Sequence, residues 1–293
     1  MRADVPHFSI SERYRSMSGQ SELVLYGDFL SQCVRRVAIF LRHNDIAYEY
    51  RAFDLLRREN RTSPTYVALN PNMTVPTLVD RSDAAKRAVS ADVPAPGAEI
   101  DIPPSAAEGG FVLFESNTII RHVATTRPLK DQALYPSIEQ NPYRRAQIDQ
   151  WLDWTISALR PHVSLLMRTA YFLPLINSTP IDSAAVATVS ERVVLAIEAL
   201  ERHLAAKLTS ANHTASALFL VGNKASIADL SALCEYSQLA IIGFTPIESE
   251  SATYPAAAAW RNSVLAAFPH ISDDDLNARL LHVRESALKL PRV

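Results

Sequence analysis

The hydrophobic pattern changes part-way along the chain, and this change constrains the fold more than any other feature. Up to about residue 125, short apolar runs typical of strands alternate with segments of helical spacing. From Tyr143 onward, the periodic segments have the 3.6-residue spacing of amphipathic helices. The chain has 293 residues, enough for two domains of ordinary size. The pattern therefore predicts an α/β domain followed by an all-helical domain.

The predicted elements follow a regular order. In the first part the order is strand, helix, strand, helix, strand, strand, helix, over residues 23–26, 31–41, 47–53, 62–69, 75–80, 111–114 and 115–123. In the second part, helices are predicted over 143–168, 182–208, 226–242, 256–268 and 273–290. The predicted domains are 23–128 and 143–293, joined by a linker over 129–142. Residues 1–22 are expected to form a flexible extension, and residues 81–110, rich in Ala, Pro and Ser, a loop insertion.

Composition and charge exclude several classes of function. Lys plus Arg number 29 and Asp plus Glu 31, so the net charge is −2, and we expect neither a nucleic-acid-binding nor a membrane-binding surface. The 7 glycines form no GxGxxG motif and no phosphate-binding GxxxxGK loop. The 8 histidines and 2 cysteines lack the spacing of metal ligands, so no metal is expected. Without a disulfide framework, a secretory signal or a membrane span, the sequence predicts a reducing, cytoplasmic location.

The first candidate for chemistry is Ser31, which follows the first predicted strand at the start of a helix. The free N–H groups and positive partial charge of a helix N-terminus favour a bound anion or thiolate. The Ser31 hydroxyl is able to donate one more hydrogen bond to such a group, and nearby Cys33 is itself a candidate reactive thiol. The alternative is that Ser31 is only a helix N-cap and Cys33 only a small residue of the core.

The second candidate is the segment that leads into the third predicted strand, with Asn70-Pro71 and Val75-Pro76. Proline at a strand entrance is confined to edges and tight turns, and a cis bond there is a deliberate feature. A cis Val75–Pro76 bond would turn the main-chain N–H and C=O of Val75 outward, where an extended peptide could pair with them as an added strand. An ordinary trans proline is the alternative.

The third candidate is the pair Glu115-Ser116, where the last predicted strand gives way to a helix. A main-chain N–H and a serine hydroxyl suit a carboxylate, and an adjacent glutamate suits an ammonium group. Together they match the zwitterionic end of an amino acid. A plain helix cap is the alternative.

These motifs, in this order and each on its predicted element, resemble the glutathione S-transferase superfamily. They are Ser31-Gln32 after Leu25-Tyr26, Asn70-Pro71 with Val75-Pro76, Glu115-Ser116, and the structural capping box Ser226-Ile-Ala-Asp229. The resemblance runs from Leu23 to Phe268 and implies a thioredoxin-like domain followed by a helical domain. Within the superfamily, Ser31 at the start of the first predicted helix and the pair Glu115-Ser116 are most similar to theta-type enzymes.

The resemblance implies a glutathione transferase that serves in detoxification, with glutathione as co-substrate and a small hydrophobic electrophile as second substrate. Ser31 is then the catalytic residue, hydrogen-bonded to the glutathione sulfur. The glutathione-binding residues implied are Asn60, Arg61, Thr74, Val75, Pro76, Glu115, Ser116 and Asp149. Of these, Val75 pairs with the cysteinyl main chain, while Glu115 and Ser116 hold the γ-glutamyl ammonium and carboxylate.

The rest of the site is implied more loosely. Arg61, or else Asn60, meets the glycyl carboxylate. Asp149, on the first long helix of the helical domain, reaches the γ-glutamyl group across the interface of a homodimer. The electrophile lies against the helical domain near Trp151, Trp154 and Leu165. Packing in the core explains those three apolar residues equally well.

Departures from the theta pattern leave two alternatives open. Cys33 stands where theta-type enzymes have proline, and a Ser-x-Cys start with Arg36 is similar to zeta-type maleylacetoacetate isomerases. Those isomerases, however, have glutamine in place of Glu115. A glutathione-dependent isomerase is therefore one alternative, and a non-catalytic scaffold that kept the fold is another. The extension 1–22 and the insertion 81–110 are not family features, and the sequence leaves the electrophile open.

Overall fold

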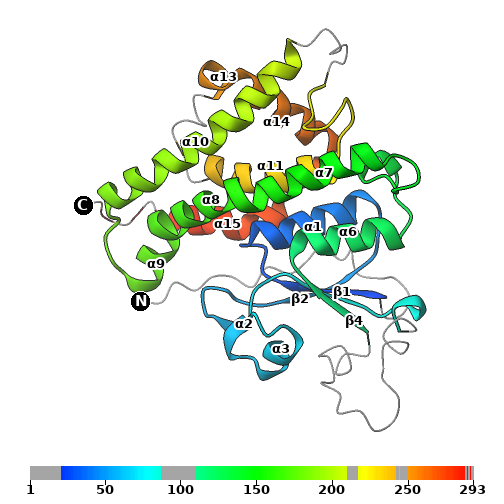
Figure 1. Cartoon of the computed structure of the whole chain (residues 1–293). Coiled ribbons are helices and arrows are strands. Elements are labelled where there is room, and N and C mark those ends of the chain that lie inside the picture. Colours follow the sequence, from blue (N-terminus) through cyan, green and yellow to red (C-terminus); the bar gives the residue numbers. More distant parts are fainter. Residues whose placement is uncertain are drawn as a thin grey trace. The chain divides into compact units, whose positions relative to one another are not determined.

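The structure is a computed structural model that describes residues 21–86, 110–209, 217–241, 244, 250–287, 289 and 291. These residues form two compact units, one ending at Pro128 and the other beginning at Leu129. The first unit contains a four-stranded sheet with helices, and the second is helical (Figure 1). The fold is therefore the thioredoxin-like domain and helical domain that the sequence predicts.

The elements of the first unit follow the predicted order. They are β1 (Leu23–Gly27), α1 (Gln32–His43), β2 (Glu49–Ala52), α2 (Glu59–Thr62), α3 (Pro64–Leu69), β3 (Thr77–Asp80), β4 (Phe111–Phe114) and α6 (Ser116–Thr126). Helix α3 begins as its sequence suggests, because the Ser63 hydroxyl accepts the Tyr66 N–H at 3.3 Å and Pro64 holds the first position. Helix α2 was not predicted, since four residues are too few to show a helical period.

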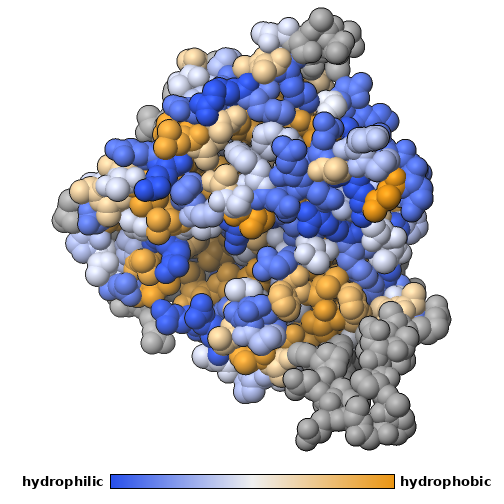
Figure 2. All heavy atoms as spheres, viewed as in Figure 1, coloured by the Kyte–Doolittle hydropathy of each residue, from blue (hydrophilic) through white to orange (hydrophobic). Residues whose placement is uncertain are grey.

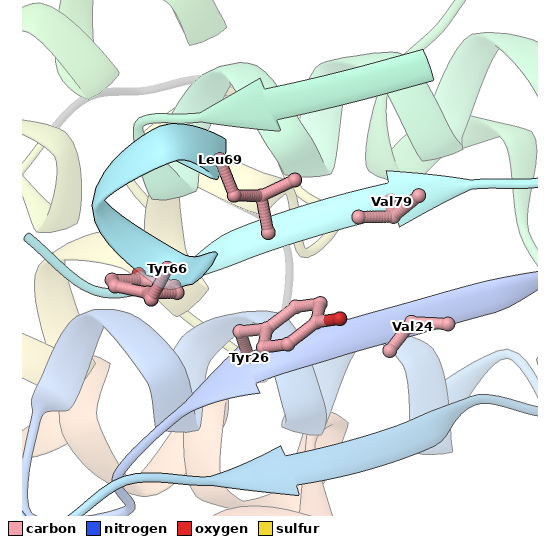
Figure 3. Packing of buried hydrophobic residues seen from close by; sticks show 5 residues of the cluster. All are labelled: Val24, Tyr26, Tyr66, Leu69 and Val79. Atoms are coloured by element: carbon pink, nitrogen blue, oxygen red, sulfur yellow. The ribbon is translucent and has the colours of Figure 1, made fainter. Parts of the chain in front are cut away.

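The strands lie in the order β2-β1-β3-β4, with β1 parallel to β2 and antiparallel to β3, and β4 antiparallel to β3. Alternate residues bury both faces of the sheet. Leu25 and Leu78 pair on the face covered by α1 and α6, and both are fully buried. On the opposite face, Val24, Tyr26 and Val79 pack with Tyr66 and Leu69 of α3 (Figure 3).

The expected insertion separates two strands that are neighbours in the sheet, because Asp80 at the end of β3 pairs with Phe111 at the start of β4. The segment does not begin as a loop: residues 83–86 form a helical turn whose start Ser82 caps, accepting the Ala85 N–H at 3.3 Å. Residues 87–109, and residues 1–20 of the expected extension, lie outside the described part of the chain.

Asp80 at the end of β3 is buried among polar partners. Its Oδ2 lies 2.9 Å from His122 Nε2, and its Oδ1 accepts from Arg127 Nη2 at 2.8 Å and from the Ser82 N–H at 3.0 Å. Burial raises the pKa of Asp80, but the hydrogen bonds from His122 and Ser82 and the charge of Arg127 outweigh it and hold this pKa well below its usual range. The ionised carboxylate therefore ties the end of β3 to α6.

We expect Asp80→Asn to lower the free energy of unfolding near neutral pH by about 1.5–3 kcal/mol, the range for hydrogen bonds to charged groups. Because the folded pKa is depressed, Asp80 stabilises the fold above its unfolded pKa of about 3.9, and this contribution is lost as the pH falls further. Urea unfolding should therefore show a difference between wild type and variant that shrinks from about pH 5 to about pH 2. A constant difference would contradict the ionic role. Asp83→Asn, at an exposed pair with Lys86, is the control and should change little.

In the part of the chain that the structure describes, the elements of the second unit are helices. They are η2 (Gln132–Leu134), α7 (Pro142–Trp154), η3 (Thr155–Leu159), α8 (Arg160–Met167), η4 (Arg168–Phe172), α9 (Leu173–Asn177), α10 (Ser183–Leu208), α11 (Ile227–Ile241), α13 (Glu250–Thr253), α14 (Pro255–Ala267), η5 (Pro269–Ser272) and α15 (Asp274–Ala287). The predicted linker thus contains a 3-10 turn, η2. In the described part of the chain, no helix is long and apolar enough to cross a membrane.

The first long helix of this unit extends further than its predicted end at Arg168. Helical structure runs without interruption from Pro142 to Asn177, with π-helical segments at η3 and η4. Pro161 and Pro174 each lie two residues after a π segment ends. A proline cannot donate to the carbonyl four residues earlier and crowds it, and a wider turn relieves that crowding. The helix therefore continues through both prolines.

Asp229 of α11 is fully buried and accepts four hydrogen bonds. Its Oδ1 accepts from the Leu220 N–H at 2.7 Å and from Trp260 Nε1 at 2.9 Å. Its Oδ2 accepts from the N–H and the hydroxyl of Ser226 at 2.9 and 2.7 Å. Burial raises the pKa of Asp229, and the four donors act against that effect. The arrangement joins the start of α11 to the preceding loop and to α14.

Candidate active site

The strand register brings the three candidate segments to one edge of the sheet. Tyr26 near the end of β1 pairs with Thr77 at the start of β3, and Thr77 also pairs with Phe114 at the end of β4. The segments that follow β1, precede β3 and follow β4 therefore meet at the same edge. These segments contain Ser31, Val75 and Ser116.

Ser31 lies directly before α1 with an extended main chain, φ −82° and ψ 123°. Its C=O accepts the N–H groups of Val34 and Arg35 at 3.1 and 3.0 Å, which begins the helix. Its side chain makes no capping hydrogen bond and is half-buried. The hydroxyl therefore does not cap α1, and it lies at a helix N-terminus, where the helix dipole favours negative charge.

The loop that carries Ser31 is held by two buried charged side chains that sequence reasoning missed. Asp28 accepts the Leu30 N–H at 2.9 Å with one carboxylate oxygen and the Leu55 N–H at 3.0 Å with the other. Arg35 Nη1 donates to the carbonyls of Phe29 and Leu30 at 2.6 and 3.2 Å. These contacts fix the main chain on both sides of Ser31. A carboxylate one residue after a buried strand was the signal that could have indicated Asp28.

Cys33 points into the core, as the simpler interpretation of its position requires. It is 5% exposed and forms no disulfide. A reactive thiol needs access, so its burial argues against a direct chemical role.

Three polar side chains donate hydrogen bonds to main-chain carbonyls of the segment before β3. Asn60 Nδ2 donates to the Met73 carbonyl at 2.6 Å, while the Tyr66 hydroxyl and Asn70 Nδ2 donate to the Thr74 carbonyl at 2.5 and 3.0 Å. Burial raises the pKa of Tyr66 despite its hydrogen bonds with Thr77 and Asn70, so this hydroxyl stays protonated as a donor. Asn60 is itself buried, whereas the neighbouring Arg61 is exposed.

Val75 ends this segment, and the bond from Val75 to Pro76 is cis. The Val75 side chain packs against the hydrophobic cluster of Val24, Tyr26, Tyr66, Leu69 and Val79. Within the described residues, the N–H and C=O of Val75 make no hydrogen bond. The main chain here is therefore available for pairing with an added strand.

Glu115 links β4 to α6 in an uncommon conformation, with φ 71° and ψ 107°. Positive φ costs a residue with a Cβ about 1–3 kcal/mol in such regions and often marks functional sites. Its side chain is exposed and does not cap the helix. The next residue, Ser116, is buried, and its Oγ lies 3.2 Å from Arg36 Nη1.

The other candidate residues belong to the helical unit. Asp149 accepts the Tyr135 hydroxyl at 3.0 Å. Trp151 packs against the His203 ring at a centroid distance of 4.4 Å and against Trp154 at 5.0 Å. Leu165 is 47% exposed. Among the described residues, no group of three or more His, Cys, Asp or Glu side chains is placed to hold a metal.

Two family models match the chain, the N-terminal domain of glutathione S-transferases over residues 30–126 and the C-terminal domain over residues 165–267. Glutathione S-transferase theta-1 of Bos taurus is 26% identical over 264 residues, which cover 90% of this chain and 91% of the relative. Human glutathione transferase theta-2, solved with glutathione, has a TM-score of 0.69 at 24% identity. A human theta-class enzyme solved with the glutathione conjugate of 1-menaphthyl sulfate has a TM-score of 0.68 at 25% identity. Each of these two comparisons covers 92% of this chain and 92% of the solved chain.

The named relatives bear on the two alternatives of the sequence analysis. All three are theta-class transferases, which favours the theta-type interpretation over a zeta-type isomerase. The matched ranges include Ser31, Val75 and Ser116 in the first model and Asp229 in the second. The chain belongs to the glutathione S-transferase superfamily.

Proposed function

We propose that this chain is a glutathione transferase that ionises the thiol of glutathione and directs the thiolate at a small hydrophobic electrophile. The observation that carries the proposal is the meeting of Ser31, Val75 and Ser116 at one edge of the sheet. A serine hydroxyl that caps nothing, set at a helix N-terminus, suits a sulfur anion. Binding the thiolate close to its target then supplies both proximity and electrostatic stabilisation.

In this proposal, glutathione lies extended along the edge of the sheet. Its cysteinyl main chain pairs with the N–H and C=O of Val75, between Thr74 and Pro76. The γ-glutamyl carboxylate accepts from Ser116, and the γ-glutamyl ammonium group binds the exposed carboxylate of Glu115.

The opposite end of glutathione carries the glycyl carboxylate. Arg61 is the residue proposed to bind it, because this guanidinium is exposed. The Asn60 amide instead donates to the carbonyl of Met73, so Asn60 contributes by shaping the segment before β3.

The second substrate is proposed to bind the helical unit near Trp151, Trp154 and Leu165. The exposed side chain of Leu165 offers apolar surface, while the stacking of Trp151 on His203 supports a structural part for that ring. The conjugate bound to the human theta-class relative supports an aromatic sulfate ester as one electrophile to try.

Product analysis tests the proposal directly. The protein is incubated with glutathione and a panel comprising an alkyl halide, an epoxide, a hydroperoxide, a quinone, 1-menaphthyl sulfate and maleylacetoacetate. We expect a thioether product, or peroxide reduction, with consumption of glutathione. Isomerisation of maleylacetoacetate without such consumption would favour the isomerase. A chain that neither binds immobilised glutathione nor turns over any member would be a scaffold.

We also propose a cytoplasmic homodimer in which Asp149 approaches the γ-glutamyl group of the partner's glutathione. Apolar side chains gather over β4, where Phe114 is exposed and the other three residues are half-buried (Figure 2). Two-fold pairing is the commonest form of oligomer and would cover such a surface. Light scattering should give a mass near that of two chains of 32.4 kDa. A mass near that of one chain at micromolar concentration would contradict the dimer.

A further inference from the structure

A fully buried guanidinium lies behind the proposed carboxylate site. Arg36 of α1 is 0% exposed, and its Nη1 lies 3.2 Å from Ser116 Oγ and 2.8 Å from Asn117 Oδ1. Helices α1 and α6 pack side by side on one face of the sheet (Figure 1). The guanidinium of Arg36 is therefore held at the first turn of α6, where it donates to Ser116 and Asn117.

This contact dictates the direction of the Ser116 hydroxyl. A guanidinium only donates hydrogen bonds, so Ser116 Oγ accepts from Arg36 and its own proton must point to another acceptor. Among the described residues, the Ser116 hydroxyl has no such acceptor. A helix N-terminus also favours a bound anion. A carboxylate oxygen of a ligand would accept the proton of the Ser116 hydroxyl.

We infer that Arg36 is a positioning residue for recognition of the γ-glutamyl carboxylate: it orients the Ser116 hydroxyl and adds positive charge behind the first turn of α6. The inference rests on the proposed function, because it needs glutathione at this edge of the sheet. Arg36 touches no substrate atom in this scheme and acts through Ser116. The competing role is a brace between α1 and α6 with no effect on which ligand is preferred.

A pair of ligands separates the two roles. One is glutathione, and the other is 4-aminobutanoyl-cysteinyl-glycine, which lacks only the γ-glutamyl carboxylate. By calorimetry, we expect Arg36→Met to weaken glutathione binding roughly ten- to hundredfold and binding of the analogue by less than about twofold. Arg36→Lys keeps a charged donor and should recover part of the affinity for glutathione.

Two controls accompany these variants. Arg42 is a second buried arginine on α1, and its Nε donates to the Tyr48 hydroxyl at 3.3 Å, away from Ser116. Arg42→Met should lower Tm and leave the ratio of the two affinities unchanged. In a Ser116→Ala background, Arg36→Met should cost much less glutathione affinity than in the wild type, because the group through which Arg36 acts is gone.

The inference is overturned if Arg36→Met weakens both ligands equally, because that is the behaviour of a brace. Should Arg36→Met fail to fold, the same ratio measured for Arg36→Lys decides the question. If the wild type binds both ligands equally, the carboxylate is not recognised and the inference fails, while the thiol chemistry of Ser31 stands. If the wild type binds neither ligand, the proposed function itself fails.

Discussion

Replacing Ser31 with alanine should raise the pKa of the thiol of bound glutathione by about 1–2 and, through the smaller thiolate fraction, slow conjugation near pH 7 roughly three- to twenty-fivefold. A free thiol ionises near a pKa of about 8.5. A hydrogen bond to a charged acceptor contributes about 1.5–3 kcal/mol, and a helix N-terminus about 0.3–1 kcal/mol more. Together these terms bring the thiol of bound glutathione to a pKa of about 6–7 in the wild type. The variant retains the helix N-terminus and loses the hydroxyl.

Titration of the ultraviolet absorbance of the bound thiolate measures this difference in wild type, Ser31→Ala and Cys33→Ala. Cys33 is the matched control, since it lies on the first turn of the same helix with its sulfur buried. Cys33→Ala should leave the pKa of the bound thiol unchanged. The pH at which the conjugation rate inflects should move upward with the thiol pKa in Ser31→Ala alone. If Ser31→Ala kept the wild-type thiol pKa and activity while Cys33→Ala lost activity, Cys33 would be the catalytic residue. The assignment as a glutathione transferase would then be wrong.

The meeting of the three candidate segments at one edge of the sheet could be predicted because it depends on local signals and on sheet topology. Ser31, Val75-Pro76 and Glu115-Ser116 each stand at a junction between elements, where turn and cap residues are recognisable. An alternating pattern of strands and helices also limits the arrangements open to a sheet. The register that brings these junctions to one edge then follows from β1, β3 and β4 pairing as neighbours.

The supports of the site could not be predicted, because they act over long stretches of sequence. Asp28 binds the Leu55 N–H, 27 residues away, and Arg36 reaches Ser116, 80 residues away. Such hydrogen bonds leave no period in the sequence, and buried charged residues look like solvent-facing ones. Only the packing of α1 against its neighbours shows that Arg36 is enclosed. The sequence around Ser31 also did not show whether the Ser31 hydroxyl caps α1.

The π turns of the long helix are a second case in which local rules were incomplete. The predicted helix over 143–168 already included Pro161, but the structure continues past Arg168 and through a second proline, Pro174, which is a breaker signal. The widened turns η3 and η4 absorb each proline, and packing of the helical unit supplies the stability that the lost hydrogen bonds do not. The helix ends at Asn177, where the next residue, Ser178, adopts the left-handed conformation with φ 54° and ψ 41°.

The largest expected effect on stability is at Asp229. Asp229→Ala would leave four buried donors without an acceptor, two from Ser226, one from Leu220 and one from Trp260. An unsatisfied buried group costs about 1–3 kcal/mol, and removal of a buried charge partner about 3–5 kcal/mol in total. We expect Asp229→Ala to lower the free energy of unfolding by about 4 kcal/mol, and Asp229→Asn by about 2–3 kcal/mol.

The milder loss in Asp229→Asn has a geometric reason. An asparagine oxygen in the place of Oδ1 can still accept from Leu220 and Trp260, but an amide NH₂ in the place of Oδ2 cannot accept from Ser226. Urea unfolding followed by circular dichroism measures the loss of helix. The control is Asp182→Asn at the exposed start of α10, where one bond to the Ala185 N–H at 2.9 Å is kept by either residue and little change is expected. Equal losses at the two positions would contradict the argument, because only Asp229 joins three segments of the chain.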